Sequence, residues 1–365
     1  MQDAIKQRLG RTLPFVPLVL GLVVLALAVA VVVVKKSDDR PRAEVGDVFA
    51  NPGGGAVKHR GEVFLPWIRL DVGAGEPRDE LPDLLGADAN VRAPKGGSFV
   101  QVQARNTGGV LLSTVTWPYT ADVELLLRAD GTDYSLSGPG GLNYTAADPN
   151  STSEERWVAV KGHPKDLAVV VRIGDEEQVV DASDGSVELG RAAELAALPT
   201  VQEHFQNRKD IGCGRFRRTD DSPVQIDYPK SVECKVQQTL RTPYVDGIGW
   251  AEPGHEFLVV QIEPPDYVDV SVPDGAPTAT SFQDTLSHSA ELGGSASLSE
   301  PADTKALGQY VLGPTAVQFV FDVAKDKPAG ALTITTHIRA RGQRGFAFRT
   351  EHAGIEWTVP GRKLA

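Results

Sequence analysis

The chain has few of the side chains that bind transition metals or carry redox chemistry. Its 365 residues include two cysteines, and Met1 is its only methionine. A copper-binding protein relies on methionine and histidine ligands, so this class is excluded. The histidines form no H-E-x-x-H motif and no pair four residues apart, which leaves a zinc hydrolase unsupported. They are His59, His163, His204, His255, His288, His337 and His352. We predict no metal and no cofactor.

The chain also lacks an excess of positive charge, because its 37 Lys and Arg residues are outnumbered by 48 Asp and Glu residues. Its formal net charge is −11, and sequence-independent nucleic-acid binding depends on Lys and Arg that displace counterions from phosphates. DNA and RNA are therefore not expected as partners. Hydrophobic residues make up 41% and charged residues 23%, which is typical of folded domains, and 37 glycines with 25 prolines favour turns and strands over long helices. The length indicates two folded units.

One long apolar run is present, at residues 13–34, and it contains no charge. As a helix it spans roughly 33 Å, enough to cross a hydrocarbon core of about 30 Å. We predict a single transmembrane helix there, after a cytoplasmic tail at residues 1–12. The alternative is a cleaved signal peptide, because Ala28-Val29-Ala30 has the form of a cleavage site. Residues 35–60, rich in charge, Pro and Gly, predict a flexible tether.

The orientation of this helix rests on the cysteines. Basic residues stand on both sides of it, so the positive-inside rule does not decide which end is cytoplasmic. Cys213 and Cys234 are predicted to form a disulfide worth about 3 kcal/mol, which implies an oxidising compartment. The alternative is two unrelated buried thiols. We expect a cytoplasmic N-terminus and an extracytoplasmic C-terminal part, localised to the cell membrane.

Short apolar or alternating runs separated by turn residues predict β-sandwiches on both sides of a connector. In the first domain, residues 61–189, strands are expected at 63–72, 98–105, 123–128, 156–160 and 167–173. Residues 190–207 predict a helical connector kinked at Pro199, the alternative being a partner-binding amphipathic helix. In the second domain, residues 208–365, strands are expected at 233–240, 257–263, 267–272, 317–323, 332–340, 345–350 and 354–359.

The two halves also resemble each other in sequence. Four pairs of identical residues recur at a constant offset of 158: Gly96 and Gly254, Phe99 and Phe257, Val102 and Val260, Gln103 and Gln261. A repeated β domain is the economical interpretation. The alternative is chance similarity between two generic strand patterns.

A family resemblance enters through G-x-F-V-x-V-x-A-x-N-T-G at residues 97–108 and LLLRADGTDYSL at 125–136. These segments resemble the telokin-like, immunoglobulin-type domain of bacterial lipoproteins and single-span membrane proteins. The match covers mainly residues 61–180, and the second half departs from it because Glu263-Pro264-Pro265 replaces Asn-Thr-Gly. The resemblance implies a β-sandwich and supplies no catalytic residue. The expected fold is thus an all-β ectodomain, two immunoglobulin-like sandwiches in tandem after one transmembrane helix. The composition resembles that of high-GC bacteria such as actinobacteria.

No catalytic residue is predicted. Ser287-His288-Ser289 places hydroxyls beside a base, but adjacent residues of a strand point apart and no G-x-S-x-G elbow is present. Calcium in turn-like loops stays open as an alternative, because hard cations take carboxylates from such loops. The carboxylates concerned are Asp130, Asp133, Asp181 and Asp184.

Two arginine clusters are the candidate binding residues. One comprises Arg215, Arg217 and Arg218, and the other comprises Arg339, Arg341 and Arg344. In an acidic protein such clusters suit an anionic lipid headgroup, a cell-wall polyanion or an acidic partner. Alternatively these arginines are solvated or paired with Asp220, Asp221 and Glu351.

The expected function is a non-catalytic binding or accessory module of a bacterial envelope, integral to the membrane, whose partner is a protein or an envelope polymer. The first alternative is a structural or assembly subunit of a membrane complex, in which the transmembrane helix itself packs against partners. An envelope hydrolase ranks last, since the sequence shows no converging polar groups.

Overall fold

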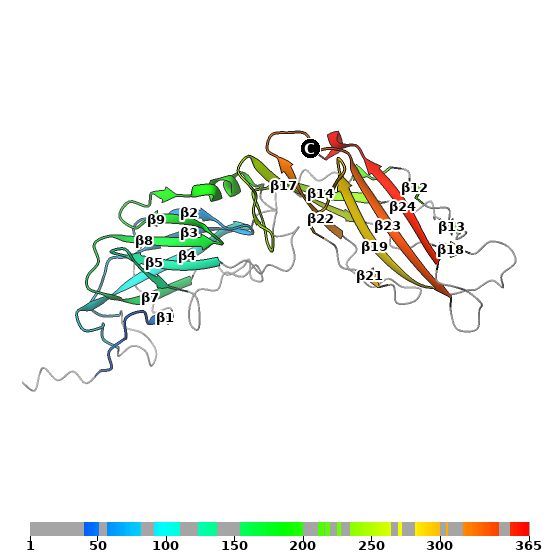
Figure 1. Cartoon of the computed structure of the whole chain (residues 1–365). Helices are drawn as coiled ribbons and strands as arrows, with labels where there is room; N and C mark the ends of the chain where they lie inside the picture. The colour runs from blue at the N-terminus through cyan, green and yellow to red at the C-terminus, as the bar shows by residue number, and fades with distance from the viewer. Residues whose placement is uncertain are drawn as a thin grey trace, which may run out of the picture.

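The computed structural model consists almost entirely of antiparallel β-sheet arranged as two lobes (Figure 1). It describes residues 40–50, 57–81, 91–109, 123–136, 154–199, 211–214, 216–219, 225–227, 234–263, 269–271, 282–299, 304–305, 317–342 and 351–364. The predicted all-β class is confirmed. Within these ranges no helix is long and apolar enough to cross a membrane. The apolar run at 13–34 lies outside the described residues.

The first lobe contains two five-stranded sheets, ordered β1-β7-β4-β3-β2 and β10-β9-β8-β5-β6. Their inner faces enclose a core in which alternate residues such as Leu125 and Leu127 of one sheet meet Leu70 and Val72 of the other. The strands are β1 (Val48–Ala50), β2 (Gly61–Phe64), β3 (Ile68–Ala74), β4 (Gly97–Gly109), β5 (Val123–Ala129), β6 (Thr132–Ser135), β7 (Glu154–Lys161), β8 (Leu167–Ile173), β9 (Glu176–Asp181) and β10 (Val187–Glu188).

The second lobe pairs a four-stranded sheet, β11-β14-β17-β22, with a larger one ordered β12-β24-β23-β19-β20, to which β21 adds beside β19. Phe319, Leu258 and Trp357 are central to its core. The strands are β11 (Ile211–Gly212), β12 (Phe216–Arg218), β14 (Lys235–Thr242), β17 (His255–Glu263), β19 (Phe282–Leu292), β20 (Ser295–Ala296), β21 (Thr304–Lys305), β22 (Val317–Ala324), β23 (Leu332–Gly342) and β24 (Glu351–Val359). Two small pairs complete the set, β13 (Gln225–Asp227) with β18 (Asp269–Ser271) and β15 (Tyr244–Val245) with β16 (Gly249–Trp250).

The predicted disulfide is present in this second lobe. Cys213 and Cys234 are bonded, and their Cα atoms lie 5.3 Å apart. Both residues are buried, and the amide of Cys213 donates a hydrogen bond of 2.9 Å to the carbonyl of Cys234. The bond therefore joins the start of β14 to the short segment that follows β11.

Seven strands follow the same path in both lobes. Sheet neighbours β3-β4-β7 correspond to β14-β17-β22, and β9-β8-β5-β6 correspond to β24-β23-β19-β20. The turns that precede β4 and β17 also agree, because Gly96 and Gly254 have φ of 68° and 84°, a left-handed conformation that favours glycine. Phe99 and Phe257 then take equivalent places in β4 and β17. The sequence repeat at offset 158 thus has a counterpart in strand order.

A third layer covers part of the first lobe and includes residues 40–43, which belong to the flexible tether predicted at 35–60. Residues 40–43 run beside residues 91–93, where the amide of Ala43 donates to the carbonyl of Arg92 and the Arg42 guanidinium donates to the carbonyl of Ala93. Together with Leu81 they cover Phe99 and Trp157 on the outer face of the sheet. Strand β1 then pairs with β7. The charged residues and the proline in residues 40–43 are typical of a linker. In the structure, however, Arg40 and Arg42 bind Glu80 and the carbonyl of Ala93 and hold this segment on the lobe.

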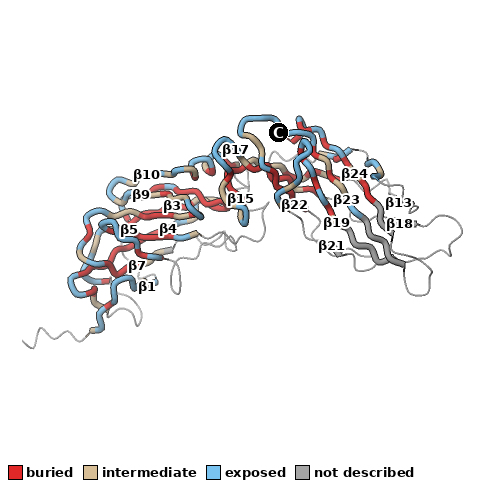
Figure 2. Tube along the Cα trace, in the orientation of Figure 1, coloured by how far each residue is buried: buried red, intermediate tan, exposed pale blue. Residues whose placement is uncertain are grey.

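The lobes meet in a continuous apolar junction. The predicted helical connector begins as a 3-10 helix, η2 (Gly190–Ala197), whose Leu195 is buried in a core that also contains Leu240 and Phe257 of the second lobe. The hairpin β15–β16 projects from the second lobe onto the first, and Figure 2 shows buried chain running through this region. A second 3-10 turn, η3 (Gly361–Lys363), follows β24.

Several strand predictions need correction. The single strand expected at 63–72 is a hairpin, β2 and β3, because the chain turns at residues 65–67. The long strand β19 was not predicted, nor were β6 and β9. The strand expected at 267–272 forms only the short pair β18 with β13, and the one expected at 345–350 lies outside the described residues.

Candidate functional site

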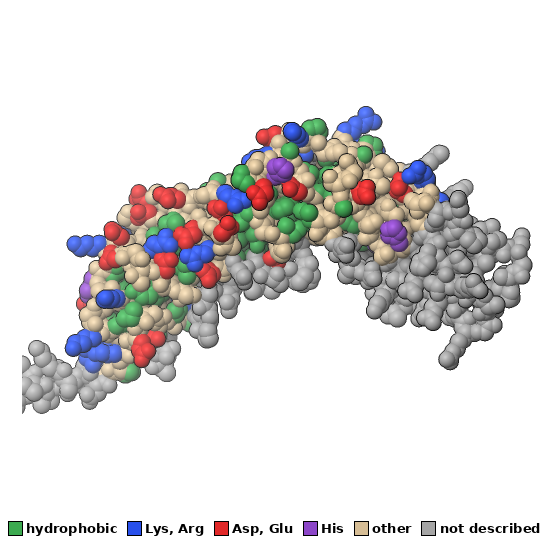
Figure 3. All heavy atoms as spheres, in the orientation of Figure 1, with side chains coloured by type: hydrophobic (Ala, Val, Ile, Leu, Met, Phe, Trp, Pro, Cys, Tyr) green, Lys and Arg blue, Asp and Glu red, His purple; other side chains and the backbone are tan. Residues whose placement is uncertain are grey.

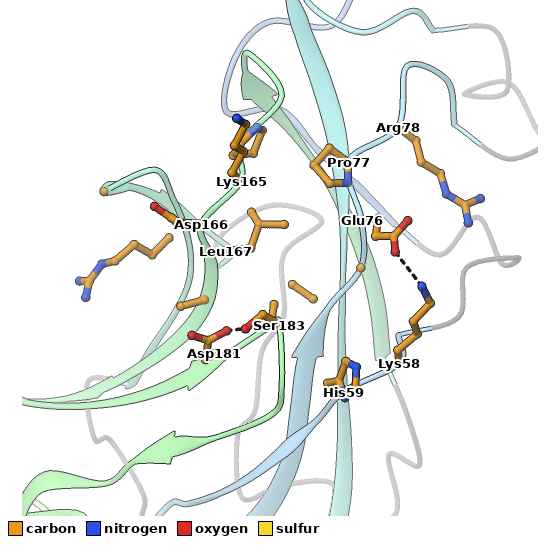
Figure 4. A pocket seen from close by; sticks show the side chains of 17 residues that line it. Lys58, His59, Glu76, Pro77, Arg78, Lys165, Asp166, Leu167, Asp181 and Ser183 are labelled. Carbon is orange, nitrogen blue, oxygen red and sulfur yellow. Dashed lines mark hydrogen bonds and ion pairs between the residues drawn. The ribbon is translucent and has the colours of Figure 1, made fainter.

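A cleft of about 760 Å³ opens where the two sheets of the first lobe separate, at the end away from the second lobe (Figure 4). One wall follows β3 and carries Glu76 and Pro77. The opposite wall comes from the turns before β8 and after β9, and carries Lys165 and Leu167. Apolar side chains therefore lie inside the cleft, and charged side chains of both signs surround its opening.

Several charged side chains at the opening already contact other groups of the protein. Lys58 and Glu76 form an ion pair of 2.7 Å, and this contact lowers the pKa of the Glu76 carboxyl. Asp181 Oδ1 accepts a hydrogen bond from the amide of Ser183. The Arg78 guanidinium lies 5.8 Å from the ring of Trp157. The described lining includes Ser183 and His59, and no hydrogen bond joins these two side chains.

An ionic network covers the outer face of the sheet next to the cleft. Arg128 donates to Asp133 at 2.7 Å and 2.9 Å, and Arg172 contacts Glu177 and Glu124, both at 2.6 Å. Hydrogen bonds from these arginines lower the pKa of Asp133 and of Glu177. Beneath lie two buried aliphatic side chains of this outer face, Leu126 and Val170. The long arginine side chains pack over apolar surface there and keep the charged heads in water.

The described members of the two predicted arginine clusters belong to strands of one sheet. Strand β12 bears Arg217 and Arg218, and β24 separates it from β23, which bears Arg339 and Arg341. Arg218 is opposite Ile355, which is opposite Thr336. Arg339 lies three residues further along β23, a backbone separation of about 14 Å from strand spacing and rise. Arg217 is exposed and pairs with Glu356 at 3.0 Å.

The structure does not describe the remaining members of these clusters or two of the acidic partners considered for them. Arg215, Arg344, Asp220 and Asp221 lie outside the described residues. For Arg217 the acidic partner is Glu356 on the neighbouring strand, a pairing that the sequence did not suggest.

The segment Ser287-His288-Ser289 lies in β19. Its residues point to alternate sides, as expected for a strand. His288 is buried and contacts Thr336 Oγ1 at 2.9 Å, and burial lowers the pKa of its imidazole to about 4. On the outer side, Ser289 Oγ lies 3.2 Å from His337 Nε2. This contact is exposed, and neither residue is among the described residues that line the cleft.

Three of the four aspartates considered for calcium accept hydrogen bonds from backbone amides, and the fourth, Asp133, accepts them from Arg128. Asp130 Oδ1 accepts hydrogen bonds from the amides of Lys165 and Asp166, both at 3.0 Å. Asp184 Oδ1 accepts from the amide of Ser186, which lowers the pKa of Asp184. In the part of the chain that the structure describes, no three His, Cys, Asp or Glu side chains converge as metal ligands do.

The sequence did not indicate the cleft, because its walls come from five separate segments of the chain. The sequence feature that could have indicated the cleft is a proline beside charged residues shortly after a strand. This feature occurs at Pro77 and at Pro164. No known protein-family model matches the chain. No characterised protein is detectably similar to it in sequence.

Proposed function

We propose that this chain is a membrane-anchored, extracytoplasmic binding module of a bacterial envelope, built from two immunoglobulin-type sandwiches in tandem. The observation that carries the proposal is the repeated strand order of the two lobes. Tandem sandwiches with free edges and loops are a common architecture for recognition at cell surfaces, and this step is an analogy of fold.

The immunoglobulin assignment is supported by the order of the shared strands. In such sandwiches strands A, B and E share one sheet, and C, F and G share the other, with C′ added beside C in variable-type domains. Here β3-β4-β7 takes the order A-B-E, and β9-β8-β5-β6 takes the order G-F-C-C′. The second lobe repeats both orders with β14, β17 and β22 and with β24, β23, β19 and β20.

Two observations support the cellular placement. The uncharged run at residues 13–34 is long enough to cross a bilayer. The disulfide between Cys213 and Cys234 is of the kind that persists in oxidising compartments. Both agree with a cytoplasmic N-terminus and lobes outside the membrane.

The proposed contact with the partner is made by the sheet that contains β12 and β23. Arginines recur on both strands, and Arg217 stands at the sheet edge with 76% of its side chain exposed. Guanidinium groups bind carboxylates and phosphates in a two-pronged geometry, so the matching partner is an acidic protein surface or an anionic envelope polymer.

Protease treatment of spheroplasts tests the placement. Protease added outside should digest the two lobes and leave a membrane-associated fragment that begins at the N-terminus. Complete protection of the lobes until the membrane is lysed would contradict the proposal.

Purification in mild detergent distinguishes binding from assembly. A soluble acidic protein or polymer that is released by salt supports a binding module. A stoichiometric integral membrane partner that survives high salt and depends on residues 13–34 would favour an assembly subunit instead.

A further inference from the structure

The described chain begins very close to the proposed membrane span. Only residues 35–39 separate the end of the apolar run from Arg40. Six Cα–Cα steps reach at most about 20 Å, whatever conformation they adopt. About 5–8 Å of this length is needed to pass the headgroup region. Arg40 therefore lies within about 15 Å of the membrane surface.

Residues 40–43 are held firmly on the first lobe. The Arg40 side chain pairs with Glu80 at 3.2 Å, and the backbone of Arg42 bridges to Arg92. The buried side chain of Ala43 packs into the layer over Phe99 and Trp157. The short connection thus leads directly into a packed segment of the first lobe. It therefore limits how far the lobe can move from the membrane span.

The end of the lobe that receives this segment is the end that bears the cleft. The amide of Gly46 donates to the carbonyl of Ala159, two residues before β7 ends at Lys161. Lys95 lies in the turn before β4, whose first residue pairs with Lys161. Lys165 belongs to the cleft wall. In Figure 1 the chain enters at this end, opposite the second lobe.

Exposed cations gather at this end although the whole chain is acidic. They are Arg42, Lys58, Arg78, Lys95, Lys161 and Lys165, and Figure 3 shows Lys and Arg side chains over this tip of the molecule. Carboxylates are interspersed among them, as in the Lys58–Glu76 pair. Other exposed carboxylates at this end include Glu44, Asp47 and Asp166, so its placement against phosphate-bearing headgroups rests on the short connection and not on net charge.

We propose that this cleft-bearing end of the first lobe lies against the lipid headgroup layer, and that the second lobe is the membrane-distal one. The inference rests on the proposed membrane anchor. The packed junction joins the second lobe to the opposite end of the first, so the arginine-bearing strands β12 and β23 lie farther from the bilayer than the cleft does. The occupant of the surface is the bilayer itself.

The experiment uses the full chain reconstituted in phosphatidylcholine vesicles with and without phosphatidylglycerol. Three single variants, Lys95→Cys, Lys165→Cys and Glu291→Cys, carry a fluorophore on the new thiol, and the vesicles contain a lipid with a quencher on its headgroup. We expect loss of fluorescence at positions 95 and 165 and none at position 291. Equal quenching at all three positions, or quenching at 291 alone, would overturn the proposal.

A matched control lengthens the connection. Twenty Gly and Ser residues inserted between Asp39 and Arg40 give a flexible segment with an end-to-end distance of about 25 Å. We expect the quenching at 95 and 165 to be lost while the protein stays on the vesicles. Undiminished quenching would refute the role given to the short connection. A chain that does not float with vesicles at all would instead refute the anchor, so the two failures are distinguishable.

Discussion

The indole Nε1 of Trp250 donates a hydrogen bond of 2.9 Å to the carbonyl oxygen of Ile173 and so joins the hairpin of the second lobe to the last residue of β8 in the first. The Arg191 guanidinium lies 5.4 Å from the indole ring and also contacts Glu176 and the carbonyl of Ala251. One aromatic side chain therefore connects both lobes and the connector.

Removing this side chain should separate the unfolding of the two lobes. Trp250 is half-buried, so Trp250→Ala should cost about 2–3 kcal/mol, less than a fully buried aromatic. We expect one calorimetric transition in the parent chain and two in the variant. Trp250→Phe, which keeps an aromatic ring and loses the N–H, should cost only about 1 kcal/mol and retain one transition. Two transitions in the parent chain would show that the junction does not couple the lobes.

Loss of the disulfide should destabilise the second lobe alone. The bond closes a loop with a sequence separation of 21, for which the chain-entropy relation gives about 3 kcal/mol. The double variant Cys213→Ala, Cys234→Ala should lower the midpoint of the second lobe in denaturant, most clearly in the Trp250→Ala background. When the unreduced, denatured parent chain is alkylated and analysed by mass spectrometry, neither cysteine should carry the label. Full labelling of both cysteines would contradict this expectation and weaken the extracytoplasmic placement.

His288 should make the second lobe sensitive to mild acid. Burial lowers the pKa of His288 from 6.5 to about 4, so the unfolded chain binds the proton more readily than the folded chain does. Stability should consequently fall as the pH is lowered from 6.5 towards 4, by up to about 3 kcal/mol at 1.36 kcal/mol per pH unit. His288→Gln, which can still bond Thr336, should flatten the profile in this window. An identical slope in the variant would assign the acid sensitivity to other groups.

Removing the charge of the second predicted arginine cluster should weaken binding without unfolding the protein. Arg339, Arg341 and Arg344 changed together to Ala should reduce binding to linear polyphosphate, used as a polyanion probe, most strongly at low salt where screening is least. Ion pairs of arginines at protein surfaces contribute about 0–1 kcal/mol, and we expect the change in stability to stay within about 1 kcal/mol. Arg105→Ala in the first lobe, which breaks the exposed pair with Asp71, is the matched control. Unchanged binding and salt dependence in the triple variant would remove this sheet from the proposed contact.

The strands that the sequence predicted well are those with a clear apolar pattern. β8 was predicted with its observed bounds because Val169, Val170 and Val171 form a continuous apolar run, and β4, β5 and β17 were placed to within a few residues. β19 was missed because polar residues such as Ser287, His288 and Ser289 interrupt its alternation. Its long pairing with β23 is a tertiary contact that local sequence does not encode.

The candidate sites were predictable to a smaller extent. The disulfide followed from the presence of only two cysteines in one turn-rich region. The cleft did not, because Pro77, Lys165 and Asp181 approach one another only when two sheets are stacked. The packing of residues 40–43, within the predicted tether, was missed for a related reason. Arg42 resembles a solvated linker residue until the carbonyl of Ala93 is placed within 3.1 Å of it.

The three-residue strand β1 also has a mechanical consequence. It enters from the cleft-bearing end and runs antiparallel to β7, with Val48 opposite Val158 and Ala50 opposite Arg156. A pull on the lobe through Arg40 first loads the backbone bridge between Arg42 and Arg92. The turn at residues 44–47 follows, so β1 is loaded only after that bridge has opened. Tension between the membrane and a bound partner would thus be carried first by residues 40–43 and then by the pairing of β1 with β7.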